Sequence, residues 1–330
     1  MSHWIADHAE QTAVSFLAAL SPISGIFADT RLPSRSLFRG VGDQSYRLFP
    51  TAFRDGVGSY RWHAHKYKWP FPTQRQQIQA EFSWLRSFVE AADQQGHAIP
   101  EDSQAFRSAL DSLDESLSSL TRQKMPTWPP PILWSSLGLA QHYGAPTRLL
   151  DWSLSPYVAA YFAATSALKR KLPDGQLSVW VISRSFFEVS SILSPEGASE
   201  NTLSFRMVTV PGAGNANLRA QRGVFLVYRQ FGIDLESEFK PKAYDEVLAK
   251  EGPLQSATSP ILFNVRLPQT EAPELLRLLA FKGVTGATVL PGLDGAAALV
   301  REQNQWPTFE SQAQSPHFNK IMRSLLGEPK

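Results

Sequence analysis

The sequence predicts an α+β fold in which a helix-rich N-terminal half packs on a mainly antiparallel, strand-rich C-terminal half. Up to about residue 170 the apolar residues recur at helical spacing, and beyond it they fall in short runs typical of buried strands. Regular helices do not separate these runs. That layout argues against a doubly wound parallel sheet and favours segregated helices and strands.

The N-terminal half predicts five helices and one strand. Residues 74–93 place their apolar side chains on one face of a helix. The prolines at 129–131 forbid a helix there, and helical spacing resumes over residues 132–142. A short strand over residues 36–40 leads into a Gly-rich turn over 40–43. The other helices are expected over residues 3–20, over 103–120, and around Val158, Ala159, Phe162 and Ala163.

The C-terminal half predicts mostly strands. They are expected over residues 177–182, 205–210 and 223–228 and within 260–267, followed by a helix over 271–282. A last short strand over residues 286–290, a tight turn over 291–295 and a closing helix over 318–326 complete the chain. We therefore expect one α+β domain over residues 1–302, helical at 1–170 and strand-rich at 171–302, with a tail at 303–330.

Composition excludes several classes of function. The 330 residues carry a net charge of +2, so no global field attracts nucleic acid or an anionic membrane. The absence of cysteine excludes disulfides, thiolate zinc sites and a cysteine nucleophile. His63 and His65 have no third metal ligand nearby, so no metal is expected. No apolar run is long enough to span a membrane and the N-terminus does not resemble a signal peptide, so we expect a cytoplasmic protein.

The first candidate motif is Phe38-Arg39-Gly40, at the end of the first predicted strand. An arginine there can point into a pocket, where its planar guanidinium grips two phosphate oxygens, and glycine lets backbone approach closely. The plainer interpretation is a surface arginine beside an ordinary turn. Three letters alone favour that plainer interpretation.

The second motif places His142, Tyr143, Thr147, Arg148, Asp151 and Trp152 between two apolar helices. Asp151 or Ser153 can cap the second helix, which would make the segment a polar connector. A cap does not account for the other side chains together. A helix N-terminus beside an arginine attracts anions, which suits a ligand that carries phosphate, and the His and Tyr rings can stack on its base or ribose.

Two further segments can reach a cleft or a nucleic acid. Gln221 and Arg222 stand where a polar loop enters a strand, and the alternative there is a solvated lead-in. Residues 60–72 are basic and aromatic. Such a loop can contact a phosphate backbone or stack on bases, although a solvated loop with anchored aromatics is the commoner case.

Three segments together resemble the bacterial FRG domain family, named for its Phe-Arg-Gly motif. They are LFRG at 37–40, LFPTAFR at 48–54 and AQHYGAPTRLLDWSLSPYVAAYFA at 140–163. AQRGVFLV at 220–227 and GVTGATVLPGLDGAA at 283–297 are similar to later parts of the family pattern. Members often occur with mobile elements, phages and defence-like loci, so the resemblance implies a toxin or an antiphage effector.

A more distant resemblance is to the ADP-ribosyltransferases, whose first motif is an Arg-Gly on an early strand. It implies an ADP-ribosyltransferase-like fold in which Arg39 holds the phosphates or ribose of NAD. Residues 221–223 would then stand in place of that family's Gln-x-Glu pair. Position 223 is glycine, so the usual carboxylate is missing, and Asp151 is the acid within the motifs that can replace it.

The leading hypothesis is an enzyme with NAD as substrate that moves ADP-ribose to water or to a macromolecule, either nucleic acid or protein. Its catalytic candidates are Asp151, His142 and Gln221, and its ligand-binding candidates are Arg39, Gly40, Tyr143, Thr147, Arg148 and Trp152. The second hypothesis is a non-catalytic module whose same pocket senses a nucleotide or binds RNA or DNA ends, with residues 60–69 as the contact surface. The third is a buried structural network in which Arg148 pairs with Asp151.

Overall fold

The structure is a computed structural model, and it covers most of the chain. The residues described are 5–21, 36–54, 59–62, 65–68, 71–119, 123–170, 172, 174–184, 187, 205–211, 216–250 and 262–307, with the backbone alone at 59–62, 65–68 and 250. The helix expected over residues 318–326 lies outside them. No helix in these ranges is long and apolar enough to cross a bilayer.

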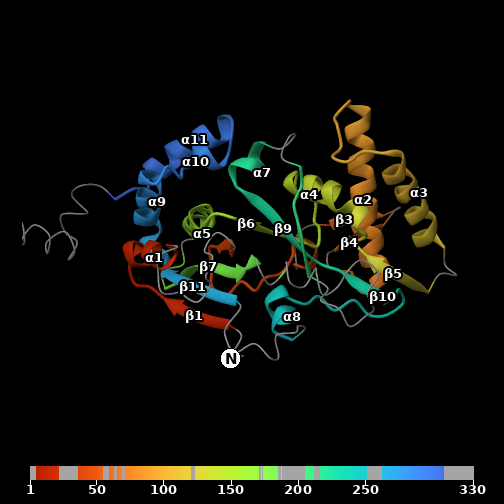
Figure 1. The fold of residues 1–330 in the computed structure, drawn as a ribbon, viewed down its shortest axis with the longest axis horizontal. Coiled ribbons are helices and arrows are strands. Elements are labelled where there is room, and N and C mark those ends of the chain that lie inside the picture. The colour runs from red at the N-terminus through yellow and green to blue at the C-terminus, as the bar shows by residue number, and fades with distance from the viewer. Residues whose placement is uncertain are drawn as a thin grey trace, which may run out of the picture.

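A seven-stranded mixed sheet forms the centre of the fold, in the order β1-β11-β7-β2-β6-β9-β8 (Figure 1). All neighbours are antiparallel except β1 and β11. The α+β class is therefore confirmed. The strands are β1 (Ile5–Ala9), β2 (Ser36–Val41), β6 (Leu149–Ser153), β7 (Gln176–Ser183), β8 (Phe205–Val208), β9 (Gly223–Tyr228) and β11 (Leu262–Pro268).

Both halves of the sequence contribute to this sheet. β1, β2 and β6 come from the part expected to be mainly helical, with β1 at one edge of the sheet and β2 beside β6 between strands from the second half. β2 lies between β7 and β6 and is buried on both faces, with Leu37 on one side and Phe38 on the other. The sheet therefore combines strands from both parts of the sequence.

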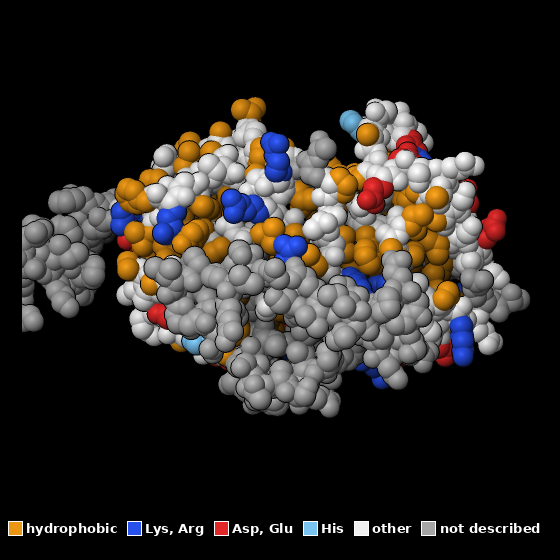
Figure 2. Space-filling model, viewed as in Figure 1, with side chains coloured by type: hydrophobic (Ala, Val, Ile, Leu, Met, Phe, Trp, Pro, Cys, Tyr) orange, Lys and Arg blue, Asp and Glu red, His pale blue; other side chains and the backbone are white. Residues whose placement is uncertain are grey.

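Three helices cover one face of the β1-β11-β7-β2 side of the sheet. They are α1 (Ala13–Ala19), α5 (Pro156–Arg170) and α9 (Ala272–Phe281), which share one apolar core with β7 and β11. α10 (Gly286–Val289) and α11 (Leu293–Gln303) follow α9 at the same end (Figure 1). Figure 2 shows hydrophobic side chains on the surface over these last helices, where Phe281, Leu293 and Val300 are exposed.

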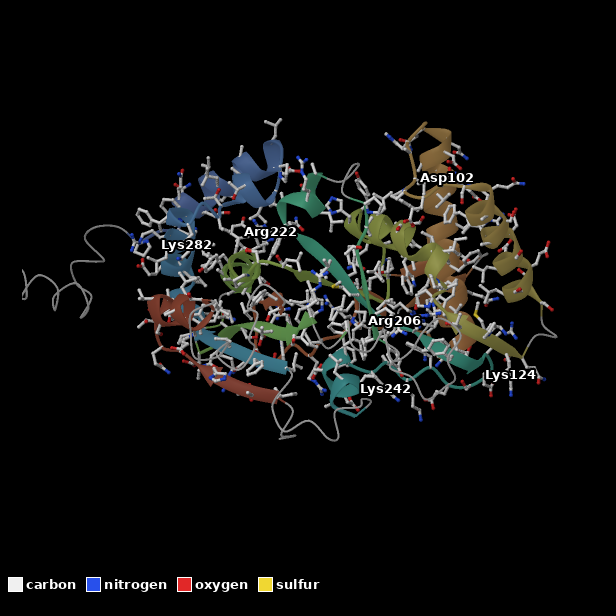
Figure 3. The ribbon with its side chains drawn as sticks, in the orientation of Figure 1. Asp102, Lys124, Arg206, Arg222, Lys242 and Lys282 are labelled. Carbon is white, nitrogen blue, oxygen red and sulfur yellow. The ribbon has the colours of Figure 1, made fainter. Side chains whose placement is uncertain are left out.

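A second group of helices packs at the other end of the molecule. It comprises α2 (Gln74–Gln94), α3 (Gln104–Ser118), η4 (Pro131–Leu133) and α4 (Trp134–His142), beside the paired strands β5 (Lys124–Trp128) and β10 (Gln230–Asp234). In Figure 3, Lys124 of β5 and Lys282 after α9 lie at opposite ends. The helices α2, α3, α4, α5 and α9 confirm five predicted segments.

The remaining elements complete the opposite face and the connections. α8 (Tyr244–Lys250) and the short η3 (Thr51–Phe53) pack on the face of the sheet that carries Leu37 and Trp180. η7 (Gln269–Glu271) precedes α9, and α7 (Ala216–Ala220) precedes β9. The basic segment expected as a loop over 60–72 instead includes the antiparallel strands β3 (Ser59–Trp62) and β4 (His65–Lys68).

The helix predicted over residues 3–20 is wrong in its first part. Residues Ile5–Ala9 form β1, which pairs in parallel with β11 from Ile5↔Leu262 onward. The helix begins only after Thr12, whose Oγ1 accepts a hydrogen bond from the Ser15 N–H at 3.2 Å. The spacing of apolar residues within a short segment cannot predict a strand whose hydrogen-bond partner lies more than 250 residues away.

Four other local predictions are also wrong. Residues 286–290, expected as a strand, contain α10, which begins after a capping box formed by Thr285 and Thr288. The tight turn expected over 291–295 is the start of α11, with Gly292 at its N-cap. Residues 149–153, expected as a connector, form the central strand β6. The helix after β6 is capped by Ser155, whose Oγ accepts from the Val158 N–H at 3.4 Å, and not by Asp151 or Ser153.

Candidate functional site

The candidate site lies where the central sheet opens between β2 and β6. β2 pairs with β7 along its full length, and β6 pairs with β9 along its full length. Between β2 and β6 the register contains a single pair, Phe38↔Ser153. The two strands therefore diverge beyond Phe38, and at Asp151 the backbone of β6 faces a side chain of β2 where a sheet would normally continue.

The side chain of Arg39 enters this opening. Its Nη1 donates to the main-chain oxygen of Asp151 at 2.5 Å and lies 3.5 Å from the carboxylate Oδ2. Arg39 is largely buried, with 14% of its side chain exposed, whereas 59% of the Asp151 side chain is exposed. The structure thus brings together a guanidinium and a carboxylate that are 112 residues apart in the sequence.

Asp151 is held from a second side by Gln141, a residue that sequence reasoning missed. The Gln141 Nε2 donates to Asp151 Oδ1 at 2.5 Å, and the Thr147 hydroxyl donates to Gln141 Oε1. Because Thr147 occupies the amide oxygen, the amide nitrogen faces the carboxylate. Gln141 directly precedes His142 in the AQHYG stretch, and this position is the sequence feature that could have marked it as a site residue.

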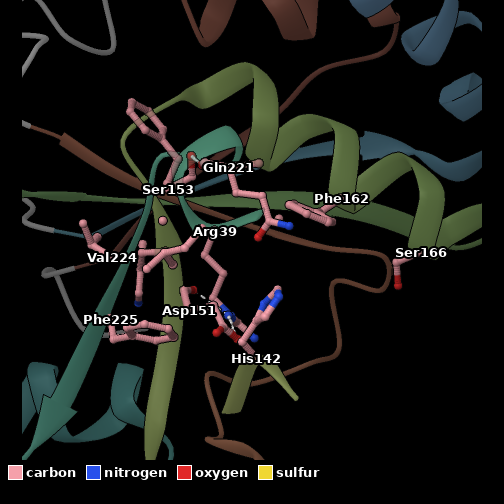
Figure 4. A pocket seen from close by; sticks show the side chains of 15 residues that line it. Arg39, His142, Asp151, Ser153, Phe162, Ser166, Gln221, Val224 and Phe225 are labelled. Carbon is pink, nitrogen blue, oxygen red and sulfur yellow. Dashed lines mark hydrogen bonds and ion pairs between the residues drawn. The ribbon is translucent and has the colours of Figure 1, made fainter. Parts of the chain in front are cut away.

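A pocket of about 360 Å³ opens beside Arg39 and Asp151; it is called the first compartment below. Figure 4 shows Arg39, Asp151 and His142 converging on one side of it, with Gln221 and Phe162 on others. The side chains come from β2, β6, β9, α4 and α5 and from the residues around α7. Its lining is Phe38, Arg39, Gly40, His142, Asp151, Trp152, Ser153, Ala159, Phe162, Ser166, Leu218, Gln221, Gly223, Val224 and Phe225.

His142 stands at the C-terminal end of α4, where Gly144 takes a positive φ and ends the helix. One nitrogen of its ring, Nε2, lies 2.9 Å from the Asn217 side-chain amide. Burial lowers the pKa of His142, and the charge of Asp151 partly offsets this. A neutral imidazole can accept a proton or a hydrogen bond from a ligand in the compartment.

We predict that His142 in the folded protein titrates below its ordinary pKa of about 6.5. Because the folded pKa is depressed, the contribution of His142 to stability is complete above about pH 6.5 and is lost as the pH falls through the folded value. NMR titration of the imidazole measures this. The Asp151→Asn variant should titrate lower still, because it lacks the charge that raises the pKa. A higher value in that variant would contradict the assignment.

Gln221 enters the first compartment from the short connection between α7 and β9. The Ser153 hydroxyl donates to the Gln221 main-chain oxygen at 2.7 Å, which ties the end of β6 to this connection. Gly223 follows at the start of β9, and a Cβ there would lie 2.4 Å from the Leu218 side chain. A glutamate at position 223 would therefore require Leu218 to move.

Gly40 serves close packing between β2 and α5. A Cβ on Gly40 would lie 1.8 Å from the Ala159 carbonyl oxygen and 2.8 Å from the Ala163 nitrogen, both in the α5 backbone. A Cβ on Gly42 would likewise lie too close to Ser166 and Ala167, which follow further along α5. The close approach expected at Gly40 is therefore to a helix, and it positions α5 as one wall of the compartment.

A larger hollow of about 780 Å³, called the second compartment, adjoins the first. The two share Arg39, Gly40 and Ser166 in their linings, so they adjoin at these residues, and together they are called the groove below. The residues that line only the second compartment are Val41, Gly42, Ser45, Tyr46, Arg47, Phe49, Phe53, Arg54, Arg170 and Pro241. Neither aspartate nor glutamate occurs among these described lining residues.

Arg148 lies outside the groove, in the interior between β6 and α2. Its Nε and Nη2 donate to the Glu81 carboxylate at 2.7 and 2.9 Å, and both side chains are 1% exposed. Its Nη1 donates to Gln230 at 2.8 Å. The pairing of Arg148 with Asp151 expected under the structural hypothesis is therefore wrong, because the partner of Arg148 is Glu81.

The remaining candidates divide between the groove and its surroundings. Trp152 is buried and lines the first compartment. Thr147 is buried behind Asp151, where it acts through Gln141. Tyr143 is exposed, stacks on Phe88 and meets His142 edge-on, outside the groove lining. Among the described residues no group of three or more His, Asp or Glu side chains is arranged to hold a metal ion.

Comparison with known proteins gives one match. Residues 34–171 match the family model of the FRG domain. This span contains Arg39, His142 and Asp151 and ends before Gln221, so the groove combines matched residues with later ones. No curated protein and no solved structure matches the chain.

Proposed function

We propose that this chain, whose residues 34–171 match the FRG domain, binds NAD in the groove and cleaves the bond between nicotinamide and ribose. ADP-ribose then passes to water or to a macromolecular acceptor. The observation that carries the proposal is the contact between Arg39 and Asp151 at the first compartment. It places a buried cation for phosphate next to an exposed carboxylate for the developing positive charge.

The proposed chemistry is assigned to Asp151. As the C–N bond breaks, its electron pair leaves with nicotinamide and the ribose becomes oxocarbenium-like. A carboxylate beside the anomeric carbon stabilises that charge. In the hydrolytic reaction a water oxygen then bonds to the anomeric carbon, and its proton passes through the carboxylate to solvent. Gln141 and Arg39, each holding one oxygen, fix the orientation of Asp151.

The other lining residues supply binding and positioning. Phe162 and Phe225 are aromatic walls of the first compartment, suited to a flat ring such as nicotinamide. His142 and Gln221 face the same space and can hydrogen-bond ribose hydroxyls. Part of Arg39 also faces the second compartment, so a phosphate bound there would lie next to the ribose. The resemblance to FRG domains supports a role as a toxin or antiphage effector.

The test is NAD turnover by purified protein, followed as nicotinamide release with and without candidate protein and nucleic-acid acceptors. We predict that Asp151→Asn lowers kcat about a hundredfold, because the amide cannot stabilise the cation or accept the proton. The matched control is Asp111→Asn, an exposed aspartate that pairs with Arg86 on the outer helices. It should retain the wild-type rate. An Asp151→Asn variant as active as wild type would overturn the assignment of the carboxylate.

A second candidate function is a non-catalytic nucleotide-binding module. The observation that favours it is that Asp151 is the one acid among the described lining residues of the first compartment. The same purified proteins distinguish the two functions. Binding of ADP-ribose without release of nicotinamide from NAD, with every acceptor tried, would favour the binding module over the enzyme.

A further inference from the structure

We propose that the second compartment binds a pyrophosphate through Arg54 and Arg39, so that the ligand of the groove carries a diphosphate and is not a nucleoside or a nucleoside monophosphate. The inference rests on the proposed NAD site and deepens it, because it names the residues that would hold the pyrophosphate. Arg54 ends the LFPTAFR stretch and had no assigned role. The contacts of the four arginines that line this compartment carry the argument.

The first step is that the two compartments adjoin at three lining residues. Arg39 and Gly40 of β2 and Ser166 of α5 line both hollows. In the proposed binding mode, a ligand whose ribose lies next to Asp151 extends past Arg39 into the larger hollow. The volume of about 780 Å³ there exceeds the 360 Å³ of the first compartment, which leaves room for a second nucleoside beyond the phosphates.

The second step is the charge balance of the lining. Arg47 is already bound: its Nε donates to the buried Asp245 at 2.5 Å and its Nη2 lies 3.8 Å from Glu246. Arg39 is shared with Asp151. Arg54 differs, because its Nε donates to the Phe49 carbonyl at 2.9 Å and no carboxylate of a described residue lies within ion-pair distance of it. Among the described residues, no carboxylate engages the terminal nitrogens of Arg54, which the proposal assigns to the ligand.

The third step is that Arg54 and Arg39 share one electrostatic environment. Burial lowers the pKa of both guanidinium groups, and the charge of Arg54 lowers the pKa of Arg39 further. The charge of Asp151 raises the pKa of both arginines and so opposes this effect. Two cations beside one carboxylate leave a net positive charge in a partly buried place. An anion with several oxygens relieves that repulsion, and a guanidinium can grip two of them at once.

Arg170 completes the anion-binding wall from α5. Its guanidinium stacks over the Tyr46 ring with 4.4 Å to the centroid and lies 3.7 Å from Asp43, a long contact for an ion pair. The Ser45 N–H and hydroxyl both donate to Asp43 Oδ1, at 2.9 and 2.7 Å, and Oδ2 is the oxygen nearest Arg170. The stacking on Tyr46 orients Arg170, which is one of the residues that line the compartment. A diphosphate next to Arg54 would therefore have a second cation within the same hollow.

The experiment compares ligands that differ in the pyrophosphate. Calorimetric affinities of ADP-ribose, AMP and ribose 5-phosphate are measured for wild type, Arg54→Gln, Arg170→Gln and Arg301→Gln. Arg301 is an exposed arginine of α11 that lines neither compartment, so its variant is the matched control. ADP-ribose should bind wild type at least about tenfold more tightly than AMP, and Arg54→Gln should remove about tenfold of its affinity. Arg170→Gln should remove less, and the control none.

The outcomes separate this inference from the proposed function. If ADP-ribose binds as expected but NAD is not cleaved, the enzyme assignment fails and the pyrophosphate site stands. If NAD is cleaved while Arg54→Gln keeps both the ADP-ribose affinity and the KM for NAD, the pyrophosphate site is overturned and the enzyme stands. If AMP binds as tightly as ADP-ribose, the ligand class is wrong. A raised KM with unchanged kcat in Arg54→Gln supports the inference.

Discussion

Replacing Glu81 with alanine is expected to lower the free energy of unfolding by about 3–5 kcal/mol. The Glu81 carboxylate accepts two hydrogen bonds from Arg148, and both side chains are 1% exposed. It also accepts from the Trp128 indole at 2.9 Å and from Gln77 at 2.8 Å. The alanine variant would leave the Arg148 charge buried without its counter-ion. Urea unfolding followed by circular dichroism measures the loss.

The control for this variant is an exposed pair of the same kind. Glu274 and Arg277 form an ion pair on α9 with about a quarter of each side chain exposed. Glu274→Ala should cost about 0–1 kcal/mol, because solvent screens the pair and hydrates the arginine that remains. If both variants lost the same free energy of unfolding, burial of the Glu81–Arg148 pair would add nothing to its contribution to stability. Since Arg148 directly precedes β6, the same pair also anchors the strand that carries Asp151.

Gly40→Ala is expected to destabilise the protein by about 3 kcal/mol or more, at the upper end of the cost of overpacking. The new methyl group would lie 1.8 Å from the Ala159 carbonyl oxygen, and backbone atoms of a helix cannot move aside as a flexible side chain can. α5 would have to shift away from β2. Thermal or urea unfolding measures the effect.

Gly96→Ala is the comparison for Gly40→Ala. Gly96 has a positive φ of 73°, but no atom lies within 4 Å of the position its Cβ would take. That variant isolates backbone strain, worth about 1–2 kcal/mol. A loss at Gly40 no greater than the loss at Gly96 would contradict the close packing of β2 on α5. A large loss at Gly40 would mean that the glycine of the Phe-Arg-Gly motif is needed for the fold.

Much of the fold could be predicted where an element is long and its periodicity is decided locally. α2, α3, α5 and α9 bury one apolar stripe each, and β7 carries an apolar run because both of its faces are covered. Edge and central strands without such a signature were missed. β1 and β6 are short, and their hydrogen-bond partners are distant in sequence, so the local spacing of apolar residues does not predict them.

The candidate site could likewise be predicted only in part. Arg39, His142, Asp151 and Gln221 were chosen from local residue chemistry, and the structure places all four around one compartment. Arg148 was chosen by the same reasoning but lies in the interior. An arginine next to a polar cluster has the same local pattern whether its partner is a ligand or a buried glutamate. The position of Glu81 in space, 67 residues earlier in the chain, decides between them.

The sequence by itself determined the α+β class, the long helices and the residue types of the proposed site, because these depend on periodicity and on side-chain chemistry within a few turns of chain. Only the tertiary structure decided that β2 and β6 diverge, that Arg39 fills the opening beside Asp151, and that Gln141 and Arg54 adjoin them. The physical reason is that strand pairing and ion pairing depend on distance in space. The contact between Arg39 and Asp151, which spans 112 residues, leaves no local pattern in the sequence.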